Sequence, residues 1–401
     1  MPNDRNMSGV ITRDLAGTLR RCARSYPVVT VTGPRQSGKT TLCRAVFPRK
    51  PYVSLEPLDV RRAAAEDPRG FLSEYRRGAV IDEVQHVPEL LSYLQAEVDE
   101  RPAPGRFVLT GSQHFGLTGA IAQSLAGRTA VLHLLPPSLS ELRRFRRHPR
   151  DLLTTLWAGA YPRIHDRGIA PDRWLADYVT TYVQRDVRQV LDVGDLESFT
   201  TFLRLCAGRT AQEVNLSALG ADSGVVHNTA RAWLSVLEAS FLLLRLPAWA
   251  RNVRKQILKA PKLHFLDSGL ACHLLGIREP AQLRHHPLRG AIFESWVVSE
   301  VHKACANRGV SQPLAHYRDA KRLEEDLVVE AGDRVILAEA KSGATMSDHG
   351  LEALHRLADA LRAHRQHRSL DLRVVYGGDM RQRRGDVRVV PWYEIQRGAW
   401  W

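Results

Sequence analysis

The sequence predicts an α/β protein with an N-terminal parallel sheet, a helical middle region and a C-terminal α/β domain. Residues 1 to about 142 alternate short apolar runs with helical segments, which is typical of a parallel sheet covered by helices. From about residue 151 to 240 the apolar residues take helical spacing, and from about residue 290 helix and strand patterns mix again. A chain of 401 residues is long enough for such domains. We place them at 1–142, 143–285 and 286–401.

Five strand-like runs define the N-terminal part. Each is almost continuously apolar, so we expect strands that are buried on both faces of the sheet. They are PVVTVTG (27–33), YVSLE (52–56), GAVIDEV (78–84), RFVLTGS (106–112) and RTAVLHLLP (128–136). The charged run RRFRRHPR (143–150) follows the last strand and marks the first boundary.

The composition favours an anionic partner. The formal net charge is +14, and the isoelectric point is near 9.9. Excess lysine and arginine favour nucleic acid or an anionic membrane surface, although a generally basic proteome would give the same balance. Five cysteines without a metal-ligand or disulfide pattern indicate a reducing, cytoplasmic setting. No apolar run approaches the ~18 residues of a membrane span, so we expect no membrane partner.

The stretch GPRQSGKT (33–40) matches the phosphate-binding pattern G-x-x-x-x-G-K-[ST] in full. It follows a strand-like run and precedes the helix-like TLCRAVF, which is the context that this motif requires. Backbone N–H groups and a helix N-terminus would face the anion, Lys39 would reach the β- and γ-phosphates, and Thr40 would bind Mg²⁺. The residues that we expect to hold ATP are Gly33, Pro34, Arg35, Gln36, Ser37, Gly38, Lys39, Thr40 and Thr41.

Two acidic residues end the third strand-like run. Asp82 would complete the Mg²⁺ site, and Glu83 would act as the general base that polarises the attacking water. The alternative is an acidic strand end that caps the next helix. The run RFVLTGSQ also ends in polar residues, where Thr110, Ser112 or Gln113 would sense the γ-phosphate or serve as turn caps. We favour Ser112 among these three.

An ordered series of segments resembles one prokaryotic group of the AAA superfamily of ATPases, whose members carry a C-terminal domain of unknown function. The matching text runs from LTGSQHF, QSLAGRTAVLHLLPPSLSEL, GAYPRI and YVTTYVQRDVRQV to GAIFESWVVSEV, AEAKSG and VVYGGDMRQRRGDVRVVPW. This resemblance implies hydrolysis of ATP with Mg²⁺ and an arginine, from the same or a neighbouring subunit, that stabilises the transferred phosphate. Arg128 is our first candidate and Arg185 the second, and either one would equally serve as an ion-pair partner. A homo-oligomer is the assembly that a neighbour's arginine implies.

The middle region resembles a helix-turn-helix followed by a hairpin, which together make a winged helix. In ALGADSGVVHNTARAWLSVLE (218–238) the second helix would present His227, Asn228 and Arg231 outward. The core-facing positions would be Val226, Ala230, Trp233 and Leu237. A basic hairpin tip would follow, with Arg251, Arg254, Lys255, Lys259 and Lys262. DNA contact is one interpretation of this pattern. The alternatives are an interdomain or protein-binding module and an ordinary solvated surface.

Four positions after residue 290 resemble the PD-(D/E)xK nuclease core. Glu294 lies in a helical pattern, Asp326 on one strand, and Glu339 and Lys341 two residues apart on the next. In that core the acids hold Mg²⁺ and the lysine orients a water. The register is open, because EEDLVV also offers Glu324 and Glu325. The alternative is a nuclease-like fold that serves as scaffold or DNA-binding module without cutting.

These features together predict an ATP-hydrolysing protein that acts on or near DNA, with its nucleotide state coupled to the C-terminal domain. One alternative is a nucleotide-gated, Mg²⁺-dependent DNA nuclease with a role in defence. Another is a non-enzymatic, nucleotide-dependent switch that binds protein.

Overall fold

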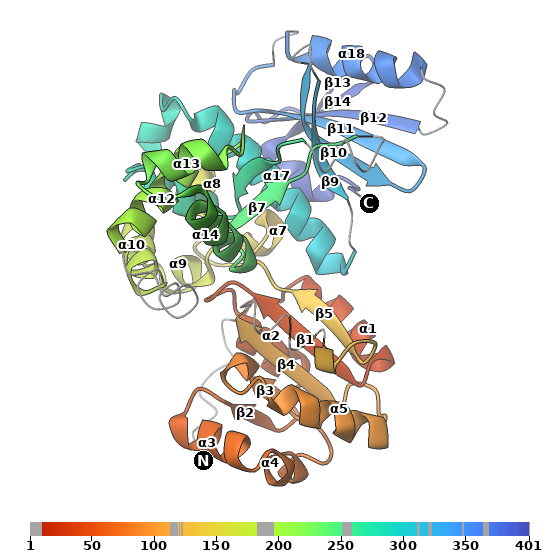
Figure 1. The fold of residues 1–401 in the computed structure, drawn as a ribbon. Helices are drawn as coiled ribbons and strands as arrows, with labels where there is room; N and C mark the ends of the chain where they lie inside the picture. Colours follow the sequence, from red (N-terminus) through yellow and green to blue (C-terminus); the bar gives the residue numbers. More distant parts are fainter. Residues whose placement is uncertain are drawn as a thin grey trace.

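A computed structural model shows how the three parts are arranged. It describes residues 10–112, 119, 121, 123–182, 196–250, 259–310, 313–319, 323–346, 349–363 and 369–400. The N-terminal domain lies at one end of the molecule, and the middle region and C-terminal domain lie beside each other at the other end (Figure 1).

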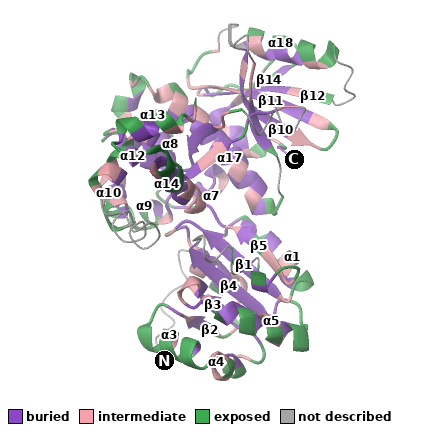
Figure 2. Cartoon of the chain, in the orientation of Figure 1, coloured by how far each residue is buried: buried purple, intermediate pink, exposed green. Residues whose placement is uncertain are grey.

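The N-terminal domain is built on a five-stranded parallel sheet in the order β2-β3-β4-β1-β5. Its strands are β1 (Val28–Gly33), β2 (Tyr52–Ser54), β3 (Val80–Asp82), β4 (Phe107–Ser112) and β5 (Thr129–His133). Its helices are α1 (Leu15–Ser25), α2 (Lys39–Val46), α3 (Leu58–Glu66), α4 (Pro68–Glu74), η1 (Val84–His86) and α5 (Leu90–Glu100). Every residue of the central strands β1 and β4 is buried (Figure 2). The predicted parallel sheet is therefore confirmed.

Two apolar layers cover this sheet, one on each face. Leu15, Leu19 and Leu42 from α1 and α2 pack against Val29 and Val31. Side chains of α4 and α5 pack with Ile81, Phe107 and Leu109 in the second layer. Because the strands are parallel, the carboxyl ends of β1, β3 and β4 meet at one edge of the sheet, where ligands bind in such folds.

The middle region combines helices with a small antiparallel sheet in the order β6-β8-β7. Its helices are α7 (Leu139–Leu142), α8 (Leu152–Ala158), α9 (Pro162–Arg167), α10 (Pro171–Tyr182), α12 (Leu196–Gly208), α13 (Leu216–Asp222), α14 (His227–Ala239), α16 (Ser268–Leu274) and η3 (Pro280–Arg284). Its strands are β6 (Gln212–Glu213), β7 (Leu243–Leu246) and β8 (Lys262–Phe265). Phe199 and Phe202 meet the Trp233 ring edge-on, which anchors α14 in the core.

Two sequence predictions for this region are wrong. Val226, expected in the core, precedes α14 and is 70% exposed, because the helix begins only at the next residue. Lys262, expected at a solvated hairpin tip, begins β8 and is 2% exposed. His227 and Arg231 are exposed as predicted. Residues 251–258, with Arg251, Arg254 and Lys255, lie outside the described residues.

The C-terminal domain has a six-stranded mixed sheet in the order β13-β14-β12-β11-β10-β9. Its strands are β9 (Leu314–Arg318), β10 (Glu324–Ala331), β11 (Arg334–Lys341), β12 (Ser369–Tyr376), β13 (Gln382–Arg384) and β14 (Val387–Pro391). Its helices are α17 (Arg289–Arg308), α18 (His349–Ala363) and η4 (Trp392–Arg397). Phe293 and Trp296 of α17 pack against Ile336, while α18 packs with Leu337 in a second core, so the two helices cover opposite faces.

The N-terminal domain joins the rest of the molecule through α17, which packs against α1. The Thr18 hydroxyl donates to the Asn307 carbonyl at 2.9 Å across this junction. Among the described helices, none has the length and apolar character to cross a bilayer.

Candidate functional site

The loop between β1 and α2 has the backbone of a phosphate cradle. Gly33 ends β1 with φ 150°, and a Cβ there would lie 2.2 Å from the Leu134 carbonyl oxygen, so glycine is required. Gln36 and Gly38 also have positive φ, at 64° and 94°. These angles turn the chain so that α2 begins at Lys39. Pro34 is buried, Arg35 is half-buried and Thr41 is exposed on α2.

The Lys39 side chain folds back over this loop. Its Nζ donates to the carbonyls of Gly33 at 3.1 Å and Pro34 at 2.9 Å. Burial lowers the Lys39 pKa to about 8, although Glu83 and Asp82 act in the opposite direction. Because Nζ already lies over the loop, Lys39 can exchange these two carbonyl oxygens for phosphate oxygens with little movement of its side chain.

Asp82, at the end of β3, accepts hydrogen bonds from three hydroxyl groups. Thr40 Oγ1 lies 2.9 and 3.0 Å from its two carboxylate oxygens, and the Tyr52 hydroxyl lies 2.9 Å from Oδ2. Thr110 Oγ1 donates to Oδ1. The structure thus brings together Thr40 and Asp82, the two residues predicted to bind Mg²⁺.

Glu83 directly follows Asp82 at the same sheet edge. Its backbone is left-handed, with φ 57° and ψ 44°, which costs a non-glycine residue about 1–2 kcal/mol. The Gln85 side-chain amide donates to its Oε2. A strained backbone at a carboxylate beside the phosphate loop is characteristic of a functional position.

Ser112 lies beside Gly33 in the β1–β4 register and is buried. The residue of β4 that contacts the acidic pair is Thr110, two positions earlier. Gln113, the third residue considered from the sequence, lies outside the described residues. Ser112 therefore lies near the loop, and its role as a γ-phosphate sensor stays a prediction.

Arg128 is placed away from the phosphate loop of its own chain. It precedes β5, and its carbonyl accepts from Val28 at the amino end of β1, whereas the loop follows the carboxyl end. Its guanidinium pairs with Asp99 at 2.5 and 2.7 Å. Within one chain, the length of β1 thus lies between Arg128 and the phosphate loop, so Arg128 stays a prediction for the site of a neighbouring subunit. Arg185 lies outside the described residues.

Sequence reasoning missed Arg13, which braces the phosphate loop. Its guanidinium donates to the Ser37 carbonyl at 2.8 Å, to Glu141 Oε1 at 2.9 Å and to the Leu135 carbonyl at 2.7 Å. Burial alone would raise the Glu141 pKa, but Arg13 and the amides of Ser138 and Asp14 lower it overall. No motif marks Arg13, and 128 residues separate it from Glu141.

The segment around α7 continues from this brace to the C-terminal domain. The Leu139 amide donates to Glu300 Oε2 at 2.8 Å, and Lys303 Nζ lies 2.9 Å from Glu300 Oε1 and 3.3 Å from the Pro137 carbonyl. Glu300 and Lys303 are both buried. A continuous buried set of polar contacts thus connects the phosphate loop with α17.

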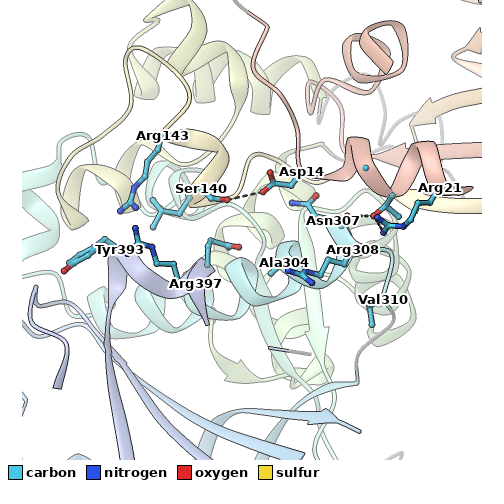
Figure 3. Close-up of a pocket in the computed structure, with 14 residues that line it drawn as sticks. Asp14, Arg21, Ser140, Arg143, Ala304, Asn307, Arg308, Val310, Tyr393 and Arg397 are labelled. Atoms are coloured by element: carbon cyan, nitrogen blue, oxygen red, sulfur yellow. Dashed lines mark hydrogen bonds between the residues drawn. The ribbon is translucent and has the colours of Figure 1, made fainter. Parts of the chain in front are cut away.

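A basic groove of about 690 Å³ lies at this junction (Figure 3). Arg143 and Arg397 lie on one side of it with Tyr393, and Arg21 and Arg308 lie on the other. Asp14, the one carboxylate among the described residues that line it, already accepts from Ser140 and Arg144. The groove therefore carries a net positive charge.

In the C-terminal domain, the four predicted nuclease-like residues line one pocket of about 400 Å³. They are Glu294 of α17, Asp326 of β10, and Glu339 and Lys341 of β11. Lys341 Nζ lies 2.5 Å from Glu339 Oε1, and the Ala340 amide donates to Asp326 Oδ2 at 2.9 Å. The structure brings these residues together, which sequence alone could only suggest.

A lysine from the middle region, which lines a neighbouring pocket together with Glu324, pairs with two of these carboxylates. Lys262 Nζ lies 2.9 Å from Glu294 Oε1, 2.6 Å from Glu324 Oε1 and 3.6 Å from Asp326 Oδ1. Glu325 beside them is fully buried, and neither of its oxygens has a hydrogen-bond partner among the described residues. Burial raises the pKa of both Glu294 and Glu325 well above the ordinary value.

Comparison with known proteins gives the family. Residues 25–143 match an AAA domain, and residues 149–281 and 289–395 match two domains of unknown function, DUF8612 and DUF4143. Two uncharacterized proteins, from Mycobacterium tuberculosis and Mycobacterium bovis, are each 31% identical over 344 residues, covering 84% of this chain and 75% of theirs. The chain belongs to their family.

Solved structures show weaker likeness. A Walker-type ATPase of Pyrococcus abyssi has 15% identity and a TM-score of 0.44, covering 68% of this chain and 98% of its own. RuvB of Thermotoga maritima has 20% identity and a TM-score of 0.32, covering 59% and 90%. Similarity at this level supports no statement about function.

The AAA domain implies nucleotide binding, typically of Mg-ATP, and its residues fit both groups. The Ser37 hydroxyl is fully buried at the loop and lacks a partner in the part of the chain that the structure describes. The Thr40 hydroxyl and the Asp82 carboxylate supply the oxygen donors that Mg²⁺ prefers. The C-terminal carboxylates do not fit a metal in the same way. Within the described ranges, no group of three or more His, Cys, Asp or Glu residues is placed to hold a metal ion.

Proposed function

We propose that the AAA domain of this chain binds Mg-ATP and hydrolyses it. The observation that carries the proposal is the hydrogen bond between Thr40 and Asp82, beside the Lys39 ammonium and the Glu83 carboxylate. A phosphate loop, a hydroxyl–carboxylate pair and a second carboxylate at one sheet edge supply the positions that phosphoryl transfer to water requires.

Each residue has a distinct part in this proposal. The loop amides and the N-terminus of α2 bind the phosphates, and Lys39 exchanges its carbonyl partners for the β- and γ-phosphate oxygens. Thr40 and Asp82 would hold Mg²⁺, which would supply positive charge beside those oxygens. Glu83 accepts the proton of the attacking water. We assign Ser112 to the γ-phosphate end of the site, and Arg128 to the site of a neighbouring subunit in a homo-oligomer.

The test is Lys39→Ala in the full chain, with radiolabelled ATP binding and phosphate release measured together. We expect both to be lost. Lys259→Ala is the matched control, because Lys259 is exposed and belongs to the middle region. Phosphate release that persists at the wild-type rate in Lys39→Ala would assign hydrolysis to another site or to a contaminant.

A second proposal places DNA on the basic surface of the molecule. The specific observation is the groove with Arg21, Arg143, Arg308 and Arg397, in a chain of net charge +14. Arginines bind phosphate through two donors at once, and each phosphate contact steepens the dependence on salt. The order of helices and strands from α12 to β8, which we interpret as a winged helix, would add to this surface.

The test is the binding of a labelled DNA duplex across a salt series. Arg143→Glu with Arg397→Glu should weaken binding at least about tenfold and flatten the salt slope. Arg24→Glu with Arg167→Glu changes the charge equally at exposed sites outside the groove and is the control. Equal losses in both double variants would show a general charge effect and contradict a groove site.

A third proposal is that the C-terminal domain is a nuclease-like domain, because its acidic pocket has the residues of such a core. It would either cut DNA or serve as a scaffold or DNA-binding module. In the present arrangement the carboxylates do not fit a divalent ion, so we derive no cleavage step from them. Divalent-ion-dependent cutting of DNA by the full chain, with and without ATP, tests this proposal. Cutting that is lost in both Glu339→Gln and Lys341→Ala supports a nuclease. Intact DNA under all of these conditions supports a scaffold or DNA-binding module.

A further inference from the structure

We propose that Lys262 is the resident cation of the C-terminal carboxylate cluster, and that this cluster becomes a divalent-cation site once the Lys262 charge is removed. We use the name carboxylate cluster for Glu294, Glu324, Glu325, Asp326 and Glu339. The inference concerns the cluster itself and stands whether or not the domain cuts nucleic acid.

The contacts of Lys262 are those of a cation that is paired with several carboxylates. Its Nζ lies at hydrogen-bond distance from Glu294 Oε1 and Glu324 Oε1, at 2.9 and 2.6 Å, and at the longer ion-pair distance of 3.6 Å from Asp326 Oδ1. The Lys262 side chain is 2% exposed, and the side chains of Glu294 and Asp326 are 14% and 13% exposed. A buried charge is tolerated in a protein when it is paired in this way.

The position of Lys262 is set outside the C-terminal domain. It begins β8, where it pairs with Glu213 of β6 and Leu246 of β7 in the sheet of the middle region. Glu294 lies on α17, and Glu324 and Asp326 lie on β10. The cation therefore comes from one domain and its carboxylates from another, so that the cluster and the middle region hold each other in place.

Lys262 and a divalent ion compete for the same carboxylate oxygens. Mg²⁺ and Ca²⁺ need oxygen ligands at about 2.0–2.6 Å, and here those oxygens already accept from the ammonium. An ion beside Nζ would also meet a positive charge at only a few ångströms. This competition explains why the nuclease-like residues converge and yet do not form a metal site in this arrangement.

The cluster offers further carboxyl oxygens for such an ion. Burial and neighbouring carboxylates raise the pKa of Glu294, Glu325 and Glu339, so a bound ion would displace protons from these groups. Among the described residues, the five carboxyl groups of the cluster lie near two ammonium groups, Lys262 and Lys341. Glu325 adds two buried oxygens that lack hydrogen-bond partners within the described part of the chain. Removal of the Lys262 charge would leave at least three carboxylates without their cation.

The experiment counts Mn²⁺ ions bound to the full chain without nucleotide, from the electron paramagnetic resonance signal of free Mn²⁺. Lys262→Met keeps the length of the apolar stem and removes the charge. We expect it to bind one more Mn²⁺ per chain than wild type. Its affinity for Mn²⁺ at the carboxylate cluster should exceed that of wild type by about a hundredfold or more, since in wild type the opposing charge of Lys262 lies only ~4 Å away. Lys262→Met with Glu294→Gln should lose this ion, and Lys262→Arg should bind none.

Thermal melting keeps the proposal testable if Lys262→Met is unstable. Its melting temperature should fall without metal and recover with Mn²⁺, while the wild-type value should not respond. Wild-type protein that binds one Mn²⁺ and loses it in Glu294→Gln would show that the ion and Lys262 coexist, which would overturn the proposal. So would Lys262→Met that neither binds nor is stabilised by Mn²⁺. Neither readout depends on cleavage, so an absence of nuclease activity leaves the inference standing.

Discussion

Three hydroxyl groups converge on Asp82 and fix its carboxylate before any nucleotide arrives. Thr40, Tyr52 and Thr110 come from α2, β2 and β4, so three separate elements orient the same side chain. Thr40 belongs to the phosphate-loop motif, but Tyr52 and Thr110 do not. The chemistry of this residue thus depends on strand neighbours that no local motif describes.

Lys39 should make ATP binding depend on pH above neutrality. Burial lowers its pKa from 10.5 to about 8 in the free protein, and anionic phosphates would raise it again on binding. ATP should therefore bind with full affinity below pH 8 and more weakly as the pH rises through 8, with uptake of a proton. Calorimetry at pH 8.5 in two buffers of different protonation enthalpy measures this uptake. Identical binding heats in both buffers would contradict the assigned role of Lys39.

At the level of elements, the junction between β1 and the loop after it has no space for a side chain at Gly33. A methyl group there would lie 2.2 Å from the Leu134 carbonyl oxygen, and the φ of 150° is unfavourable for other residues. Gly33→Ala should lower the melting temperature and abolish ATP binding together. Gly208→Ala is the control, because a Cβ at that helical position meets no atom within 4 Å and should be neutral or mildly stabilising.

Arg13 and Glu141 should behave as one unit. Arg13→Met leaves Glu141 buried without its cation, which costs about 3–5 kcal/mol of folding free energy. Arg13→Met with Glu141→Leu should recover much of that loss, since apolar side chains can replace a buried ion pair. Urea denaturation measures both. Additive losses in the double variant would show that the two residues do not stabilise each other.

The elements themselves were largely predictable, and the contacts between them were not. The five strands of the first sheet lie within the predicted runs because buried parallel strands are almost continuously apolar. The pairing of Lys262 with Glu294 joins two domains, and no periodicity in the sequence reveals it. Val226 was misplaced because helical spacing was extended one residue beyond the start of α14. Sequence patterns report which face of an element is buried, but not which distant residue covers it.

At the level of the whole molecule, the buried contacts from Arg13 through Glu141 and Leu139 to Glu300 connect the nucleotide site to α17. ATP binding should therefore alter hydrogen exchange in residues 135–142, next to the phosphate loop, and also along α17 in the C-terminal domain. Lys39→Ala, which cannot hold ATP, is the control and should show no ATP-dependent change. Exchange that changes only around the phosphate loop would mean that the nucleotide site is not coupled to the C-terminal domain.

Glu83→Gln provides the most direct test of ATP hydrolysis at this site. Glutamine keeps the size of the side chain and its position after Asp82 but cannot accept the proton of water. At saturating Mg-ATP, phosphate release should fall about 10²–10⁴-fold, while the amount of ATP bound per chain stays at the wild-type value. Release at the wild-type rate by Glu83→Gln, or a wild-type chain that binds ATP and releases no phosphate, would contradict the account.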